Sequence, residues 1–137
     1  MIKNRYFKKI KFTKTQILKY LKNAIKDLNI AKQQKIPEVK FNYSYTALIK
    51  SGIALIASVK GLKVRSIPGH HIKILEQTSK ILNDENILII GNSMRMKRNT
   101  DLYEGGIFIS EKESEEYYSF VEETITKIKK ILEKITK

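Results

Sequence analysis

The sequence predicts an all-α protein, an antiparallel bundle of four long helices plus one shorter helix. Three observations support this class. Apolar residues recur at three- and four-residue intervals, two segments open with capping-box patterns, and the connections between segments are short. A chain of 137 residues is long enough for one ordinary domain and too short for two, so residues 1–137 are expected to form a single domain. No strand pair, repeat or low-complexity linker is expected.

The first helix is predicted from residue 14 to about residue 34, within a basic N-terminal helical segment at 13–35. Thr13 and Gln16 have the spacing of a capping box, in which each side chain satisfies a free backbone donor of the other. An apolar stripe follows at Ile17, Leu18, Leu21, Ala24, Ile25, Leu28 and Ala31. Pro37 is expected to end this helix and to open a short connection.

The second helix is predicted at residues 43–60 and should be central, because few of its positions are polar. Its small residues would let a neighbouring helix approach closely; they are Ala47, Gly52, Ala54 and Ala57. Gly61 is well placed to end this helix in the left-handed conformation.

Three more helices are expected. The third follows the loop signal at Pro68 and Gly69 and ends near Asn83. The fourth is predicted from about 85 to 99, because charged residues at helical spacing outweigh its strand-like apolar run. The fifth starts at a second capping box, Ser110 to Glu113, with acidic residues early and lysines late, as the helix dipole favours.

The formal net charge is +13, and it is concentrated near the N-terminus. Residues 1–40 carry +10, residues 41–109 carry +4, and residues 110–137 carry −1. Such a field attracts polyanions, which favours nucleic acid or an acidic protein as partner. The alternative is that the lysines lie on solvated helix faces and keep the protein soluble.

Composition also excludes several classes of site. Cysteine is absent, which rules out disulfides, a thiolate nucleophile and thiolate metal ligands. Only His70 and His71 remain as nitrogen ligands, so no metal and no cofactor are expected. No run approaches 18 apolar residues, and residues 1–11 lack the features of an export signal, so we expect a cytoplasmic protein that does not enter a membrane.

The most informative polar cluster is Arg98-Asn99-Thr100-Asp101-Leu102-Tyr103, followed by the turn that includes Glu104, Gly105 and Gly106. Its guanidinium, amide, carboxylate and phenol groups suit the binding of a phosphate or a base. Arg95 lies on the same helix face as Arg98 and would serve the same anion. Structural alternatives remain open: Arg98 pairing with Asp101 or Glu104, Asn99 ending the helix, Asp101 accepting within a turn, Arg95 in solvent, and Tyr103 packing on the bundle.

Other candidates lie before and within the third helix. His70 and His71 are placed at its start, where backbone donors favour anions. A catalytic pair is not expected, because adjacent helical residues point about 100° apart and no companion residue is indicated; one of them is expected to be a cap or a packed imidazole. Lys63 and Arg65 would extend an RNA-binding surface or lie in a solvated loop. Four of the seven tyrosines are expected in the core or at a dimer surface rather than as a stacking platform; they are Tyr43, Tyr45, Tyr117 and Tyr118.

Two stretches together resemble the HEPN family, the nucleotide-binding domains named for higher eukaryotes and prokaryotes. They are Tyr43-x-Tyr45-x-Ala47-x7-Leu55-x4-Lys60-Gly61-x8-His70 and Arg95-x2-Arg98-Asn99-x3-Tyr103-x6-Ser110-x2-Glu113-x2-Glu116. The resemblance covers about residues 42–125. It implies a helical bundle that commonly forms a homodimer and is often encoded beside a minimal nucleotidyltransferase, in toxin-antitoxin, defence or RNA-processing systems.

The resemblance also bears on catalysis. Many active members are metal-independent ribonucleases with an Arg-x4-6-His motif and an asparagine after the arginine. Arg98 and Asn99 match its beginning, but Tyr103 stands where the histidine is expected. A histidine exchanges protons near neutral pH, whereas a tyrosine, with a pKa of about 10, needs substantial tuning to act as a base. The sequence therefore favours binding over cleavage.

Three functions follow as hypotheses. The first is a protein that binds RNA, a nucleotide or a nucleotidyltransferase partner. The second is an endoribonuclease in which Arg98, Asn99 and Tyr103 act, with help from His70. The third is an antitoxin-like or scaffold subunit whose basic N-terminal helix docks an acidic protein. The expected RNA- or nucleotide-binding residues are Arg95, Arg98, Asn99, Asp101, Tyr103, His70, Lys63 and Arg65.

Overall fold

The computed structural model describes residues 5–103, 105–106 and 108–135, with the backbone alone at 101–103. Over this part of the chain it consists of five α-helices and one small two-stranded sheet. The elements are β1 (Phe7–Lys9), α1 (Lys14–Gln33), α2 (Pro37–Lys60), β2 (Leu62–Val64), α3 (His70–Leu82), α4 (Glu85–Tyr103) and α5 (Glu111–Ile135). The fold is mostly helical, in agreement with the predicted class.

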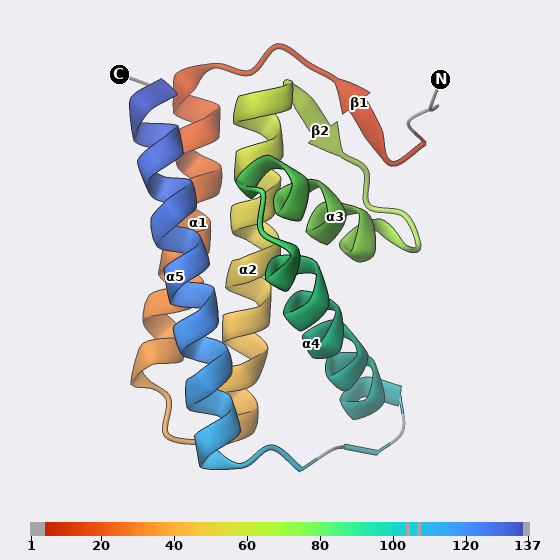
Figure 1. Cartoon of the computed structure of the whole chain (residues 1–137), viewed down its shortest axis with the longest axis vertical. Helices are drawn as coiled ribbons and strands as arrows, with labels where there is room; N and C mark the ends of the chain where they lie inside the picture. Colours follow the sequence, from red (N-terminus) through yellow and green to blue (C-terminus); the bar gives the residue numbers. More distant parts are fainter. Residues whose placement is uncertain (1–4, 104, 107, 136–137) are drawn as a thin grey trace.

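Helix α2 forms the centre of the molecule. Helices α1 and α5 pack on one side of it, and α3 and α4 pack on the other side (Figure 1). The core is built mainly around α2, and its largest fully buried side chains are Tyr45, Phe41, Leu48, Leu55, Ile56, Ile74, Leu75, Ile87, Met94, Ile109, Ile128 and Leu132. None of the helices in the described ranges has the length and apolar character needed to cross a membrane.

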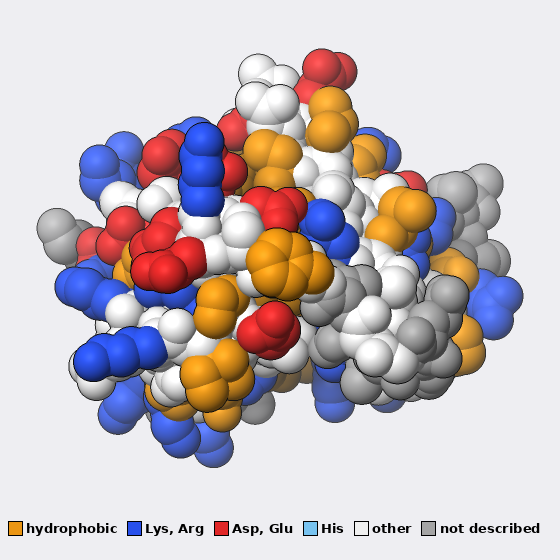
Figure 2. All heavy atoms as spheres, turned by 90° about the horizontal axis from the view of Figure 1, so that it is seen from below, with side chains coloured by type: hydrophobic (Ala, Val, Ile, Leu, Met, Phe, Trp, Pro, Cys, Tyr) orange, Lys and Arg blue, Asp and Glu red, His pale blue; other side chains and the backbone are white. Residues whose placement is uncertain are grey.

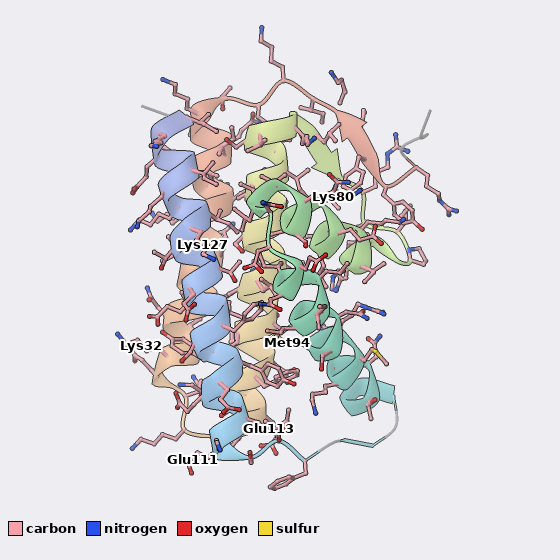
Figure 3. All side chains as sticks on the ribbon, in the orientation of Figure 1. Lys32, Lys80, Met94, Glu111, Glu113 and Lys127 are labelled. Carbon is pink, nitrogen blue, oxygen red and sulfur yellow. The ribbon has the colours of Figure 1, made fainter. Side chains whose placement is uncertain are left out.

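Both predicted capping boxes are confirmed. The Gln16 backbone N–H donates to Thr13 Oγ1 at 3.1 Å, and the Thr13 N–H donates to Gln16 Oε1 at 2.8 Å. At the start of α5, the Glu113 N–H donates to Ser110 Oγ at 3.0 Å, and the Ser110 N–H donates to Glu113 Oε1 at 3.3 Å. The acidic side chains at the start of α5 include Glu111 and Glu113 (Figure 3). Acidic, basic and apolar side chains therefore mix at this end of the molecule (Figure 2).

Three predicted helix boundaries were wrong. The second helix begins at Pro37, six residues before the predicted start at 43. Pro37 does not end the first helix, because α1 already stops at Gln33 and Pro37 is the first residue of α2. Proline suits that position, since the first turn of a helix does not need its missing N–H. Helix α4 continues to Tyr103 instead of ending near 99, so the whole segment 98–103 is helical. Gly61 ends α2 in the left-handed conformation as predicted, with φ 64°.

The expectation that the chain has no strand pair was wrong, because β1 and β2 form a two-stranded sheet. Strands β1 and β2 are antiparallel, and Phe7 faces Val64. The Arg65 N–H also donates to the Tyr6 carbonyl oxygen at 2.7 Å, and the Ile10 N–H donates to the Gly61 carbonyl oxygen at 3.0 Å. Each strand has only three residues, which is too short for a clear alternating pattern in the sequence. Burial of Phe7 holds β1 against the rest of the protein.

Helices α2 and α3 are in close contact at Gly52. A Cβ atom at this position would lie 2.6 Å from Thr78 Oγ1 and 2.7 Å from Ile74 Cγ2, both of which belong to α3. Gly91 of α4 is also tight, but there the atom at 2.6 Å is the tip of the Leu75 side chain. Of these two contacts, the one at Gly52 is the stricter, because its atoms are bonded to Cβ atoms close to the α3 backbone.

We expect Gly52→Ala to lower the free energy of unfolding by about 1–3 kcal/mol, because overpacking outweighs the higher helix propensity of alanine. Urea denaturation followed by circular dichroism measures the effect. Gly91→Ala is the matched control and should lose less, since the flexible end of Leu75 can move. Equal stability of wild type and Gly52→Ala would contradict the proposed constraint.

Candidate anion-binding site

A pocket of about 390 Å³ lies between the start of α3 and one face of α4. The segment Ser66–Ile72 forms one wall, and Arg95, Arg98 and Asn99 form the other. The left-handed Gly69, with φ 85°, turns the chain into α3 and so brings His70 and His71 to the pocket. Side chains from segments far apart in the sequence thus converge on one hollow.

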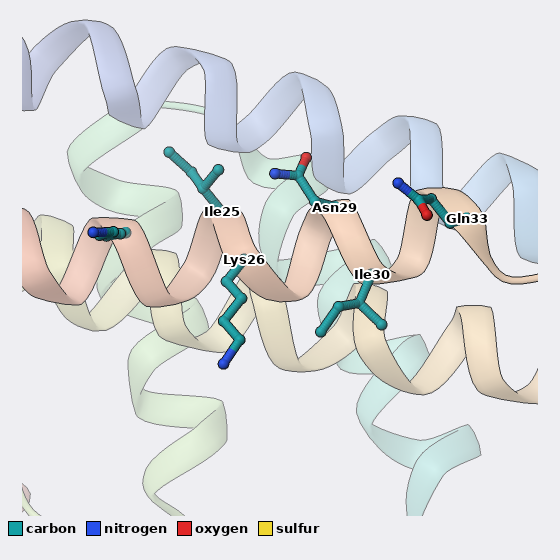
Figure 4. Close-up of a pocket in the computed structure, with 6 residues that line it drawn as sticks. Ile25, Lys26, Asn29, Ile30 and Gln33 are labelled. Atoms are coloured by element: carbon teal, nitrogen blue, oxygen red, sulfur yellow. The ribbon is translucent and has the colours of Figure 1, made fainter.

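Three other grooves are each lined by residues from a single helix. One groove of about 440 Å³ runs along α1 and is lined by Lys22, Ile25, Lys26, Asn29, Ile30 and Gln33, all from that single helix. Ile25, Asn29 and Gln33 point toward α5, whereas Lys26 and Ile30 point away from it (Figure 4). Polar groups from different elements do not meet there, so the pocket at α3 and α4 is the stronger candidate.

Arg95 and Arg98 give the pocket its charge. They lie three residues apart on α4, and both are partly buried. The Arg95 Nε–H donates to Asn92 Oδ1 at 2.9 Å. Neither arginine takes part in an ion pair with any carboxylate that the structure describes. Pairing of Arg98 with Asp101 or Glu104 involves side chains outside the described residues.

Tyr45 of α2 contacts two residues that line the pocket, Arg98 and His71. It is only 1% exposed, and the guanidinium carbon of Arg98 lies 5.6 Å from the centre of its ring. Its hydroxyl oxygen is 2.8 Å from His71 Nδ1. Burial raises the pKa of Tyr45 to about 12, against the opposing effect of Arg98 and Arg95. The phenol therefore keeps its hydrogen at neutral pH.

His71 is held uncharged beside this phenol. Burial lowers the pKa of His71 to about 4, and the neighbouring His70, Arg98 and Arg95 add to the effect. The buried phenol hydrogen needs an acceptor, and the neutral imidazole provides one at Nδ1. The tautomer that satisfies both groups leaves the ring hydrogen of His71 on Nε2, as a donor.

His70 has the opposite arrangement. Its Nδ1 lies 2.7 Å from the Ile67 carbonyl oxygen, which can only accept, so Nδ1 carries a hydrogen. The two imidazole rings touch edge to face, with centroids 4.4 Å apart. This bond is not a helix cap, because it satisfies a loop carbonyl and no side chain caps the start of α3. The partly buried His71, in contact with Tyr45, fits the alternative prediction of a packed imidazole.

The structure brings together four of the predicted site residues: Arg95, Arg98, Asn99 and His70. Lys63 and Arg65 are exposed on and just after β2, next to the pocket wall but outside its lining. The side chains of Asp101 and Tyr103 lie outside the described residues. Positions 98 and 103 are about 140° apart around the axis of the continuous helix α4.

Sequence reasoning missed the roles of His71 and Tyr45. Tyr45 is buried, as predicted, but its hydroxyl is also the companion that the histidine pair was expected to lack. The available signal was general: a buried tyrosine usually needs a hydrogen-bond partner. The sequence did not indicate which residue would supply it.

The geometry suits an anion such as phosphate, because two guanidinium groups and the N-terminal turn of α3 border the same hollow. The first backbone N–H of α3, that of His70, already donates to the Ile67 carbonyl oxygen at 3.0 Å. Across the described ranges, no three His, Asp or Glu side chains are grouped so as to hold a metal ion. Comparisons with protein-family models, curated proteins and solved structures found no match.

The low pKa of His71 predicts a pH-dependent stability. The unfolded chain takes up a proton near pH 6.5, whereas the folded imidazole takes it up only near pH 4. The stabilising contribution is thus complete above about pH 6.5 and is lost as the pH falls toward 4, by up to about 2 kcal/mol for this partly buried group.

Urea denaturation at a series of pH values tests this prediction. His71→Gln should have a shallower loss of unfolding free energy than the wild type over this pH range. Lys80→Gln, an exposed substitution on the same helix, should keep the wild-type slope. Parallel curves for wild type and His71→Gln would refute the prediction.

Proposed function

We propose that the protein binds RNA or a nucleotide through a phosphate group held by Arg95 and Arg98. The observation that supports this most strongly is the pair of guanidinium groups that lack a described carboxylate partner and face the start of α3. An anion is expected to bind more tightly to such a cationic pocket than to a surface whose arginines are already paired with carboxylates.

The neighbouring groups favour a defined orientation of the phosphate. The ring of Tyr45 lies beneath the guanidinium of Arg98, so this flexible side chain has a fixed support. His71 adds an uncharged Nε2 donor, and Asn99 offers an amide at the same wall. Phosphate oxygens are thus met by planar, directional donors rather than by mobile lysines.

In this proposal the protein is of the HEPN type, an antiparallel four-helix bundle that forms a homodimer in the cytoplasm. It acts with a minimal nucleotidyltransferase in a toxin-antitoxin, defence or RNA-processing system. The support is the resemblance over residues 42–125, together with a buried central helix ending at Gly61 and arginines on the helix before an acid-capped last helix.

One observation favours cleavage as a second candidate. The Nδ1 hydrogen of His70 is used by the Ile67 carbonyl, which directs the basic lone pair of a neutral imidazole to Nε2. A base beside Arg98 is the arrangement that a metal-independent endoribonuclease needs for attack by a ribose 2′-hydroxyl. His70 would then take the role that the sequence suggested for Tyr103.

Binding is tested by titrating the protein with AMP and with a short single-stranded RNA in a calorimeter. Arg98→Ala should weaken both affinities by about 10- to 100-fold, the usual effect of losing a charged hydrogen bond. Arg98→Lys should restore only part, since lysine lacks the planar fork. Lys80→Ala, which removes an exposed charge elsewhere, is the control. Equal affinities for all four proteins would contradict the proposal.

Cleavage is tested by incubating the same proteins with a mixed RNA pool in EDTA. The binding function predicts that the RNA stays intact. Cleavage that is lost in both His70→Ala and Arg98→Ala, but kept in Lys80→Ala, would support the endoribonuclease instead.

A further inference from the structure

The outer face of the β1–β2 sheet is strongly cationic. Lys8 and Lys63 are directly opposite each other in the antiparallel register, and both are exposed. Like charges in this position repel each other and destabilise a sheet. Arg5 and Arg65 are exposed just before β1 and just after β2. None of these four takes part in an ion pair within the part of the chain that the structure describes.

This cationic face is continuous with the pocket. The Arg65 N–H donates to the Tyr6 carbonyl oxygen at 2.7 Å, and the next residue, Ser66, already belongs to the pocket wall. Lys63 is three residues before Ser66, a backbone distance of about 10 Å in extended chain. A few nucleotides of a single strand can span that distance.

Tyr6 lies at the junction between the sheet and the pocket. The Tyr6 hydroxyl packs close to Gly69, because a Cβ atom built at Gly69 would lie 3.3 Å from the hydroxyl oxygen. A glycine at this position therefore leaves room for the Tyr6 side chain. Arg5 and Lys73 lie 5.4 Å and 5.5 Å from the centre of the Tyr6 ring. Lys73 also pairs with Glu76, whereas Arg5 forms no ion pair with a described carboxylate.

The opposite end of the molecule differs in its charge. There, acidic and basic side chains lie side by side near the start of α5 (Figure 2). At the sheet, unpaired cations continue instead from the pocket along one exposed face. A ligand with a single phosphate would use only the pocket, whereas a polyanion would use both surfaces.

We propose that the outer face of the β1–β2 sheet, formed by Lys8, Lys63 and Arg65, is a second phosphate subsite. The ligand of the pocket is then a single-stranded polynucleotide rather than a free mononucleotide. This inference rests on the proposed function of the pocket. A flexible strand fits because one phosphate must enter the concave site while its neighbours follow the exposed sheet.

The experiment compares the affinity of AMP with that of oligoadenylates of increasing length, up to about ten nucleotides. The double variant Lys8→Ala/Lys63→Ala removes two charges from the sheet. Lys129→Ala/Lys130→Ala removes two exposed charges from α5 and is the matched control. Thermal unfolding of both variants checks that the fold is retained, and removal of the facing lysine pair is expected to leave it intact.

Wild-type affinity should rise with length, while AMP binds the sheet variant and the wild type equally. For the longest oligonucleotide, the sheet variant should lose about tenfold or more in affinity. The slope of its log affinity against log salt concentration should become less steep by about one to two. The control should keep more of the affinity and of the salt dependence.

Each other result overturns a specific step. If AMP binds but length adds nothing, or if both double variants lose equally, the second subsite is refuted and the pocket proposal stands. If neither AMP nor RNA binds the wild type, both proposals fail. Equal binding of duplex RNA would refute the preference for a single strand, and equal competition by polyglutamate would favour an acidic protein partner.

Discussion

Tyr45 holds three helices together at one point, and the geometry of the pocket depends on it. The residue belongs to the central helix α2, donates its hydroxyl hydrogen to His71 on α3, and supports Arg98 on α4 with its ring. A buried phenol without a partner would be costly, so folding of the core and placement of the imidazole are coupled. The close approach of α2 and α3 at Gly52 lies about two turns further along the same two helices.

Buried or partly buried positive charges have carboxylate partners in the core but none described in the pocket. Lys40 is 4% exposed, yet its ammonium nitrogen is 3.2 Å from Glu115 and 4.6 Å from the ring centre of Tyr118. A buried charge without such partners would shift its protonation or destabilise the fold. Arg95 and Arg98 lack a described carboxylate although they are partly buried, which is the pattern expected where stability is given up for binding.

The sequence predicted the helices well because their signals are local. Capping at Thr13 and Ser110 and the stop at Gly61 each depend on residues within four positions, and apolar spacing decided the rest. The site was predicted only in part, since Arg98 and Arg95 form a local motif on one helix. The bond between Tyr45 and His71 joins residues 26 positions apart, and spacing along one helix carries no information about such a pair.

The unpredicted sheet also changes the meaning of the basic N-terminal third. That segment divides into two parts: helix α1, which carries several of the lysines, packs on the side of α2 away from α3 and α4, whereas β1 pairs with β2 on the side of the pocket (Figure 1). Charges screened over about 10 Å act mainly on what lies near them, so the two groups of lysines cannot serve the same ligand equally. Pairing with β2, rather than net charge, thus determines that Lys8 lies on the sheet that leads to the pocket wall, whereas Lys22 lies on α1.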